Sequence, residues 1–241
     1  MATAGISTLA MQLLYEDNHL YVVNKPAPLA TMGAEPGEPT AFELAVRDIR
    51  HRFQKPGRVY LGVVSRLDAM VTGVLIFART SRAAARLSEQ IRLHTARKLY
   101  LALVDPAPAI PEGHLEHWLR HNDAARRVEV VRAGATESRK AVLHFRKLAQ
   151  HGTAALLEIQ LQTGRKHQIR VQLAASGNCI AGDVRYGSRR PFPMGIALHS
   201  SATTIQHPVT RQSLTFHAPL PNYWPEWART LDMPGCTTSH D

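Results

Sequence analysis

One carboxylate stands in an unusually apolar part of the chain, where it could do chemistry. The segment Val63–Arg79 reads VVSRLDAMVTGVLIFAR, and Asp68 is its only acid. The pattern predicts strands over Val59–Val64 and Val71–Phe77, with Asp68 in the loop Ser65–Met70 between them. A carboxylate positioned in this way can act as a nucleophile or as a general base.

A second group of charged residues follows the clearest strand pattern in the chain. Leu157–Gln162 alternates as a half-buried strand does, and the segment TGRKHQIRVQLAASGN comes next, with Gly177 placed to end a helix. Arg165, Lys166 and Arg170 then crowd the first turns of that helix, where its dipole disfavours cations, so an anion should compensate them. The alternative is that Arg165 and Lys166 point into solvent.

Other segments supply the elements that position these two groups. Two of them have the pattern of strands: Leu20–Asn24 and Lys98–Val104. Thr80 or Ser81 can cap a helix, and its apolar positions are Ala84, Leu87 and Ile91. We expect a single domain of catalytic size, because 241 residues with 44% hydrophobic composition can bury a full core.

The charge of the chain points to a nucleic-acid partner. It carries 29 Lys and Arg against 19 Asp and Glu, with a formal net charge of +10 and a pI near 10.1. Most of the cations are Arg, whose planar fork binds phosphate and stacks on bases. The alternative is a solvated basic surface that binds nothing in particular.

The sequence gives no signal for a metal, a disulfide framework or a membrane span. Cys179 and Cys236 are far apart and neither belongs to a CxxC pair. His167, His199 and His207 match no compact ligand spacing, so we interpret them as packing or RNA-facing residues. No stretch approaches the roughly 18 apolar residues of a membrane helix, and no secretory signal is evident. We expect a reduced, cytoplasmic monomer without cofactor or metal.

Five blocks of sequence, in this order, resemble the RluA-type pseudouridine synthases. They are YEDNHLYVVNKPAPLATMG, SRLDAMVTG, KLYLALV, LQTGRKHQIRVQLAASGNCIAGDVRYG and ALHSSATTIQHP. The resemblance covers roughly Leu13 to Trp224. Ser65 stands where the family has His, and Val71-Thr72 stands where it has Thr-Ser.

The resemblance implies a fold and a reaction. The fold is mixed α/β (α+β), with a bent, largely antiparallel sheet, flanking helices and a central RNA-binding cleft. The reaction is the cofactor-free isomerisation of uridine to pseudouridine in ribosomal or transfer RNA, with the base flipped out of its stack. The catalytic domain would span 13–225, between an N-terminal extension (1–12) and a C-terminal tail (226–241), and we expect no S4 RNA-binding domain.

The resemblance also implies roles for individual residues. Asp68 would be the catalytic aspartate, Arg170 its ion-pair partner and Tyr100 the ring that packs on the target base. Four further residues would contact RNA: Arg66, Arg165, Lys166 and His167. Of these, Arg66 would help to displace the base. The basic loops Arg185–Arg190 and His121–Arg127 would extend this surface.

Asp68 and Arg170 make chemical sense as a pair, because burial disfavours an ionised carboxylate and an adjacent arginine favours it. We interpret Asp183, in AGDVRYG, as a turn-capping residue and not as an acid. Two other functions stay open. One is an RNA-binding or chaperone protein that keeps the fold without catalysis. The other is a glycosidase, which would need a second acid near the scissile bond, and neither motif supplies one.

Overall fold

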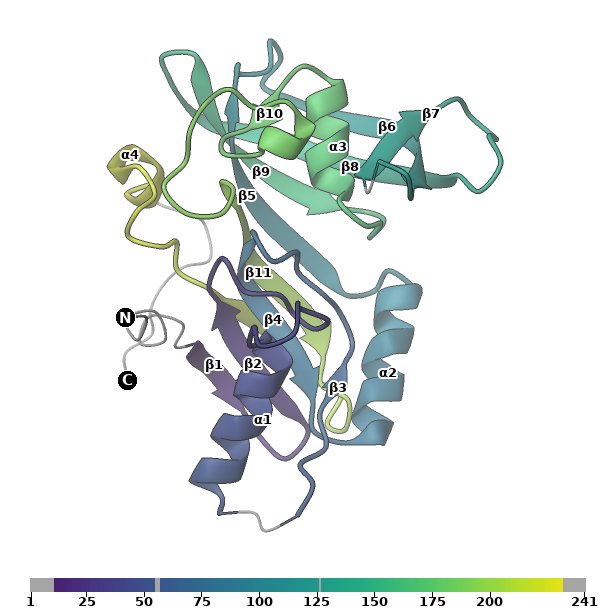
Figure 1. The fold of residues 1–241 in the computed structure, drawn as a ribbon, viewed down its shortest axis with the longest axis vertical. Helices are drawn as coiled ribbons and strands as arrows, with labels where there is room; N and C mark the ends of the chain where they lie inside the picture. Colours follow the sequence, from purple (N-terminus) through teal and green to yellow (C-terminus); the bar gives the residue numbers. More distant parts are fainter. Residues whose placement is uncertain (1–10, 55–56, 126, 232–241) are drawn as a thin grey trace.

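A mixed, largely antiparallel sheet runs through the whole structure (Figure 1), a computed structural model that describes residues 11–231 apart from 55, 56 and 126. In this part of the chain twelve strands join in the order β1-β2-β4-β11-β5-β9-β8-β6-β7, with β3, β10 and β12 paired to β4, β5 and β11. Only the β4–β11 pair is parallel among these strands. The prediction of a mixed, largely antiparallel sheet is confirmed.

The strands vary from two to thirteen residues. They are β1 (Gln12–Glu16), β2 (Leu20–Lys25), β3 (Gly62–Val63), β4 (Thr72–Ala78), β5 (Arg97–Asp105), β6 (Glu112–Asn122), β7 (Arg127–Val131), β8 (Arg139–His151), β9 (Ala154–Leu161), β10 (Cys179–Ile180), β11 (Leu198–Gln206) and β12 (Ser213–His217). The helices are α1 (Ala41–Arg52), α2 (Ser81–Arg92), α3 (Gln168–Ala175), the short 3-10 helix η1 (Val184–Tyr186) and α4 (Glu226–Arg229).

Two of the helices begin at threonine caps. The side chain of Thr40 accepts a hydrogen bond from the backbone of Glu43, whose carboxylate binds back to Thr40 and completes a capping box for α1. Thr80 caps α2 by accepting from the Ala83 backbone at 3.1 Å, which confirms one of the two predicted caps. Figure 1 shows α1 and α2 beside the part of the sheet that carries β1 to β4, and α3 beside β6, β8 and β9.

Strand β4 lies inside the sheet and is buried along its whole length. Leu75 and Phe77 pack into one hydrophobic cluster, whereas Val74 and Ile76 pack into another on the opposite face. Burial on both faces explains the unbroken apolar run in the sequence. This strand follows the Asp68 loop directly and gives it a rigid end.

A glycine permits the parallel contact between β4 and β11. Gly73 has φ +112°, and a β-carbon there would lie 2.2 Å from the carbonyl oxygen of Ser200. A larger residue would therefore force the two strands apart, because both the conformation and the space favour glycine. Gly73 keeps the strand after Asp68 pressed against β11.

Two predictions about this half of the fold are wrong in detail. The strand expected over Val59–Val64 is reduced to Gly62–Val63, because the flanking apolar side chains pack in the core without pairing their backbone. Of the apolar positions predicted for α2, Leu87 is buried and Ala84 packs partly buried against the same cluster, but Ile91 is only half-buried and the buried face also carries Ala83 and Gln90. Gln90 can be buried because its amide exchanges two hydrogen bonds with the backbone of Gln206.

Some of the predicted features lie outside the described residues. These are residues 1–10 of the expected extension, residues 232–241 of the expected tail with Cys236, and Arg126 in the basic loop between β6 and β7. The proposed domain limits therefore stay predictions. No helix within 11–231, with its gaps, is long and apolar enough to cross a membrane.

Candidate active site

Hydrogen bonds from the segment after β2 hold the loop that carries Asp68. Thr31 donates its hydroxyl to the carbonyl of Leu67 at 2.8 Å and accepts from the Leu67 N–H at 3.1 Å. The Leu29 N–H donates to the carbonyl of Ala69 at 2.9 Å. Backbone on both sides of Asp68 is thus fixed, and the carboxylate is presented by a loop that is not free to swing.

A buried lysine lies behind the same loop. The Lys25 ammonium is fully buried and donates to the carbonyls of Leu29 at 2.7 Å, Pro26 at 2.8 Å and Ala69 at 3.3 Å. Burial lowers the pKa of Lys25 to about 7, and the charge of Asp68 opposes that shift. Lys25 ties the two loops together, a role that the sequence analysis did not anticipate.

Arg170 joins two carboxylates. Its Nη1 lies 2.9 Å from Oδ2 of Asp68, while its Nε and Nη2 donate to the two oxygens of Asp183 at 2.7 and 2.8 Å. The side chain of Asp68 is 29% exposed and that of Asp183 only 2%. Burial disfavours the Arg170 cation, but the two carboxylates outweigh it and raise its pKa. The buried Asp183 anchors the arginine, and the arginine reaches outward to Asp68.

Two predictions about this region are wrong. Helix α3 begins at Gln168, so Arg165 and Lys166 lie in the preceding loop and not in its first turns. Asp183 makes no capping hydrogen bond, because both of its oxygens are engaged by Arg170. The cations at this helix were expected to need an anion. Asp183 is such an anion, but it binds the buried Arg170.

His167 is a second neighbour of Asp68. Its Nδ1 lies 2.8 Å from the hydroxyl of Tyr186, and that hydroxyl accepts from the backbone N–H of Val128 at 3.1 Å. Burial lowers the pKa of His167 to about 4, with Asp68 opposing and Arg170 adding to the shift. In the tautomer whose Nδ1 accepts the Tyr186 hydroxyl proton, Nε2–H faces Oδ2 of Asp68 across 3.6 Å.

Asp68 opens into a small pocket beside Tyr100. The pocket holds about 80 Å³. Its apolar wall is made of Leu67, Val71, Leu161, Ile169 and Leu198. Tyr100 is 7% exposed, and burial raises its pKa to about 12, so the phenol is neutral at physiological pH. The pocket can receive a flat ring between an aromatic face and aliphatic side chains.

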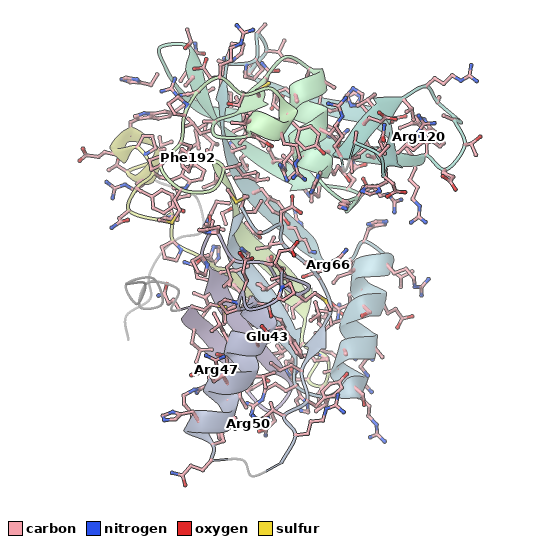
Figure 2. All side chains as sticks on the ribbon, in the orientation of Figure 1. Glu43, Arg47, Arg50, Arg66, Arg120 and Phe192 are labelled. Carbon is pink, nitrogen blue, oxygen red and sulfur yellow. The ribbon has the colours of Figure 1, made fainter. Side chains whose placement is uncertain are left out.

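The predicted RNA-contacting residues surround this pocket. Hollows of about 260, 350 and 430 Å³ adjoin it, and Arg165 lines all three. Arg66 is exposed, lines the first two, and lies in Figure 2 between the parts of the structure that carry α2 and α3. Lys166 lines the second and third hollows and lies 3.0 Å from Nε2 of His121. The structure therefore gathers these residues along one basic groove with Asp68 in it.

The other two histidines lie away from the groove. His199 is fully buried between Thr72 and the carbonyl of Ala218, and His207 binds Asp17 at 2.8 Å. Within the described ranges no three His, Cys, Asp or Glu side chains are grouped so that they could hold a metal ion. Both histidines serve packing.

Comparisons with known proteins agree on one family. The sequence profile of RNA pseudouridylate synthase matches residues 19–175. An uncharacterized RNA pseudouridine synthase of Bacillus subtilis is 32% identical over 215 residues, which are 88% of this chain and 69% of the relative. Ribosomal large subunit pseudouridine synthase D of Xylella fastidiosa is 33% identical over 229 residues, 88% of this chain and 67% of the relative. The solved structure of human RNA pseudouridylate synthase domain containing 4 has the same fold, with TM-score 0.73, 22% identity, and coverage of 88% of this chain and 89% of that chain.

Proposed function

Because the chain belongs to the RNA pseudouridylate synthase family, a family of isomerases, we propose that Asp68 is the carboxylate with which it converts specific uridines in RNA to pseudouridine. One observation carries the assignment: Asp68 contacts Arg170 at 2.9 Å at the edge of a pocket walled by Tyr100. A charge-assisted hydrogen bond holds the carboxylate in one orientation, and the pocket offers room for a ring beside it.

The chemistry asks for one well-placed carboxylate. The C1′–N1 bond of uridine breaks, a C1′–C5 bond forms, C5 loses a proton and N1 gains one. No electron is gained or lost overall, so the balance requires no redox partner. Asp68 can either add to C1′ and leave again, or take a proton from the sugar and return it. Both routes need the ionised form.

The geometry also suggests which oxygen reacts. Oδ2 of Asp68 receives Nη1 of Arg170 and faces Nε2 of His167. In the described part of the chain, Oδ1 takes no hydrogen bond from the protein. We assign Oδ1 to the sugar, with Arg170 and His167 as positioning residues that hold the carboxylate by its other oxygen.

The target base has to leave its stack to enter such a small pocket. Extracting a nucleotide costs a few kcal/mol. Stacking on an aromatic ring returns about 1–3 kcal/mol per base, which Tyr100 can supply. Arg66 lines the pocket and two adjoining hollows, and we assign it to the space that the base vacates. Phosphate contacts by Arg165 and Lys166 would supply the remainder.

The names of several relatives indicate which RNA to test first. The Xylella fastidiosa and Nitrosomonas europaea relatives are called ribosomal large subunit pseudouridine synthase D. We propose large-subunit ribosomal RNA as the first candidate substrate, and transfer RNA as the second. Mapping pseudouridines in both RNAs from cells with and without the gene tests this directly, because the missing position names the substrate.

The glycosidase alternative gains no support from the second carboxylate. Asp183 is near Asp68, but both of its oxygens are bound by Arg170 and it does not line the pocket. A general acid has to reach the leaving group. Asp183 cannot do so without giving up its ion pair.

Asp68→Asn separates an enzyme from a binding protein. The variant keeps the volume of the side chain but loses the charge and the nucleophile, and Arg170 keeps its partner Asp183. Folding and RNA affinity should stay close to wild type while pseudouridine formation is abolished. The measurement is single-turnover conversion of the mapped RNA beside a binding isotherm, with Asp105→Asn as the control. Conversion by Asp68→Asn at the wild-type rate would refute the assignment.

A further inference from the structure

One of the hollows beside the Asp68 pocket is lined by cations and by no acid. It holds about 260 Å³ between the end of α2, the start of β5 and the loop after β9. Three cationic side chains line it: Arg66, Lys98 and Arg165. The apolar part of its wall includes Ile91 and Leu161. A concave site lined by one sign of charge concentrates ligands of the opposite sign.

Lys98 is unusual among the lysines of the described residues. It is half-buried, and its ammonium meets no carboxylate or other hydrogen-bond acceptor there. Every other described lysine has a partner: Lys25 binds three carbonyls, Lys140 binds Glu116, Lys147 binds the Pro108 carbonyl and Gln150, and Lys166 contacts His121. A desolvated cation without a partner costs stability, and burial accordingly lowers the pKa of Lys98.

The position of Lys98 connects the hollow to the active site. Lys98 and Tyr100 are two residues apart on β5, so their side chains leave the same face of the sheet about 7 Å apart. Tyr100 lines both the hollow and the Asp68 pocket. A nucleotide in the hollow would therefore be an immediate neighbour of a base in the pocket.

We propose that this hollow binds the nucleotide next to the target uridine, with the Lys98 ammonium on its phosphodiester and Ile91 and Leu161 against its base or ribose. That the neighbouring nucleotide is a target uridine rests on the proposed function. The binding of a phosphodiester in the hollow does not rest on it. The ligand class is single-stranded RNA, because a base in the hollow has to be unpaired from a second strand to reach the apolar wall. Arg66 and Arg165 line the same hollow and add to its attraction for phosphate.

A generic RNA can test the site without knowledge of the natural substrate. The probe is a fluorescent seven-nucleotide oligo-uridylate, and its affinity is measured by anisotropy over a range of NaCl concentrations. Lys98→Met should weaken binding at low salt about tenfold. It should lower the log-log salt slope by about 0.7, the value for one phosphate of single-stranded RNA. Lys98→Arg should keep the slope.

Lys147→Met is the matched control, since Lys147 is also half-buried but contacts Pro108 and Gln150 away from the groove. It should leave affinity and slope unchanged. The melting temperature of Lys98→Met should equal or exceed that of the wild type, because a half-buried cation without a partner has been removed. An unchanged slope, or a clear fall in melting temperature, would overturn the proposal. A lowered slope in a chain that makes no pseudouridine would support the phosphate site while refuting the proposed function.

Discussion

Asp183 should stabilise the fold more than any other acid near the site, and Asp183→Asn tests this. The carboxylate is 2% exposed, and it receives two hydrogen bonds from an Arg170 side chain that is 7% exposed. Asparagine has almost the same shape but brings no charge, and its NH₂ group would face an arginine N–H. The substitution therefore leaves a buried guanidinium with one partner in place of two.

The expected magnitude follows from the burial of the pair. Removing one partner of a buried ion pair costs about 3–5 kcal/mol. Arg170 keeps Asp68 at 2.9 Å, which compensates part of its charge, so the low end of that range, about 3 kcal/mol, applies. For a chain of this size the melting temperature should fall by roughly 6–12 °C. Activity should fall as well, by about 100-fold, because an unanchored Arg170 no longer fixes Asp68.

Urea unfolding and single-turnover conversion of the mapped RNA are the assays. Asp105→Asn is the control, since the Asp105–Arg190 pair is equally short at 2.8 Å but its side chains are 22% and 39% exposed. A pair of that exposure contributes about 0–1 kcal/mol. Equal unfolding free energies for the two variants would refute the assignment of Asp183 as the buried anchor, whatever happens to the rate.

Three further predictions concern the groove and the loops. Arg170→Lys should lose most of the single-turnover rate while the chain stays folded, because one ammonium cannot bridge both carboxylates; a wild-type rate would contradict this. Replacing Arg165 and Lys166 by Ala should lower the salt slope of RNA binding by about 1.4, and an unchanged slope would assign both to solvent. Lys25 has a pKa of about 7 in the fold against 10.5 as a free side chain. Between these values the unfolded chain binds a proton that the folded chain does not, so the free energy of unfolding falls as pH falls from about 10.5 to 7. Met at this position does not titrate, so the free energy of unfolding of Lys25→Met should rise relative to that of the wild type as pH falls over this interval, by up to about 5 kcal/mol. The same pH dependence of unfolding in both proteins would contradict this.

The pattern of apolar and polar residues predicted the buried strand β4 well and the segment before Asp68 poorly. β4 was found to within one residue because both of its faces are buried, which leaves an unbroken apolar run. The segment before Asp68 contains buried Val59 and Leu61, yet only Gly62–Val63 pairs with a neighbouring strand. Side-chain burial and backbone pairing are separate events, and alternation of residue types reports only the first.

Buried polar residues escaped the sequence analysis for a related reason. Gln90, Lys25 and Asp183 read as surface residues by type, but each is buried with its hydrogen bonds supplied by the fold. The partners of Gln90 and Asp183 lie on other elements, and one of the three carbonyls that bind Lys25, that of Ala69, lies 44 residues away, so no local pattern reveals these contacts. The one available signal was the surplus of cations around Arg170, which demanded an anion without saying which.

The two aspartates at Arg170 show why residue type alone could not assign roles. Both carboxylates touch the same guanidinium, but Asp183 gives it both oxygens and lies in the interior, while Asp68 gives one oxygen and stays 29% exposed. A carboxylate with all its acceptors used inside the protein can only hold a neighbour in place. One with a free oxygen at a pocket can take a proton or attack carbon. Exposure and hydrogen-bond occupancy, which only the tertiary structure sets, make one aspartate the anchor and the other the candidate catalyst.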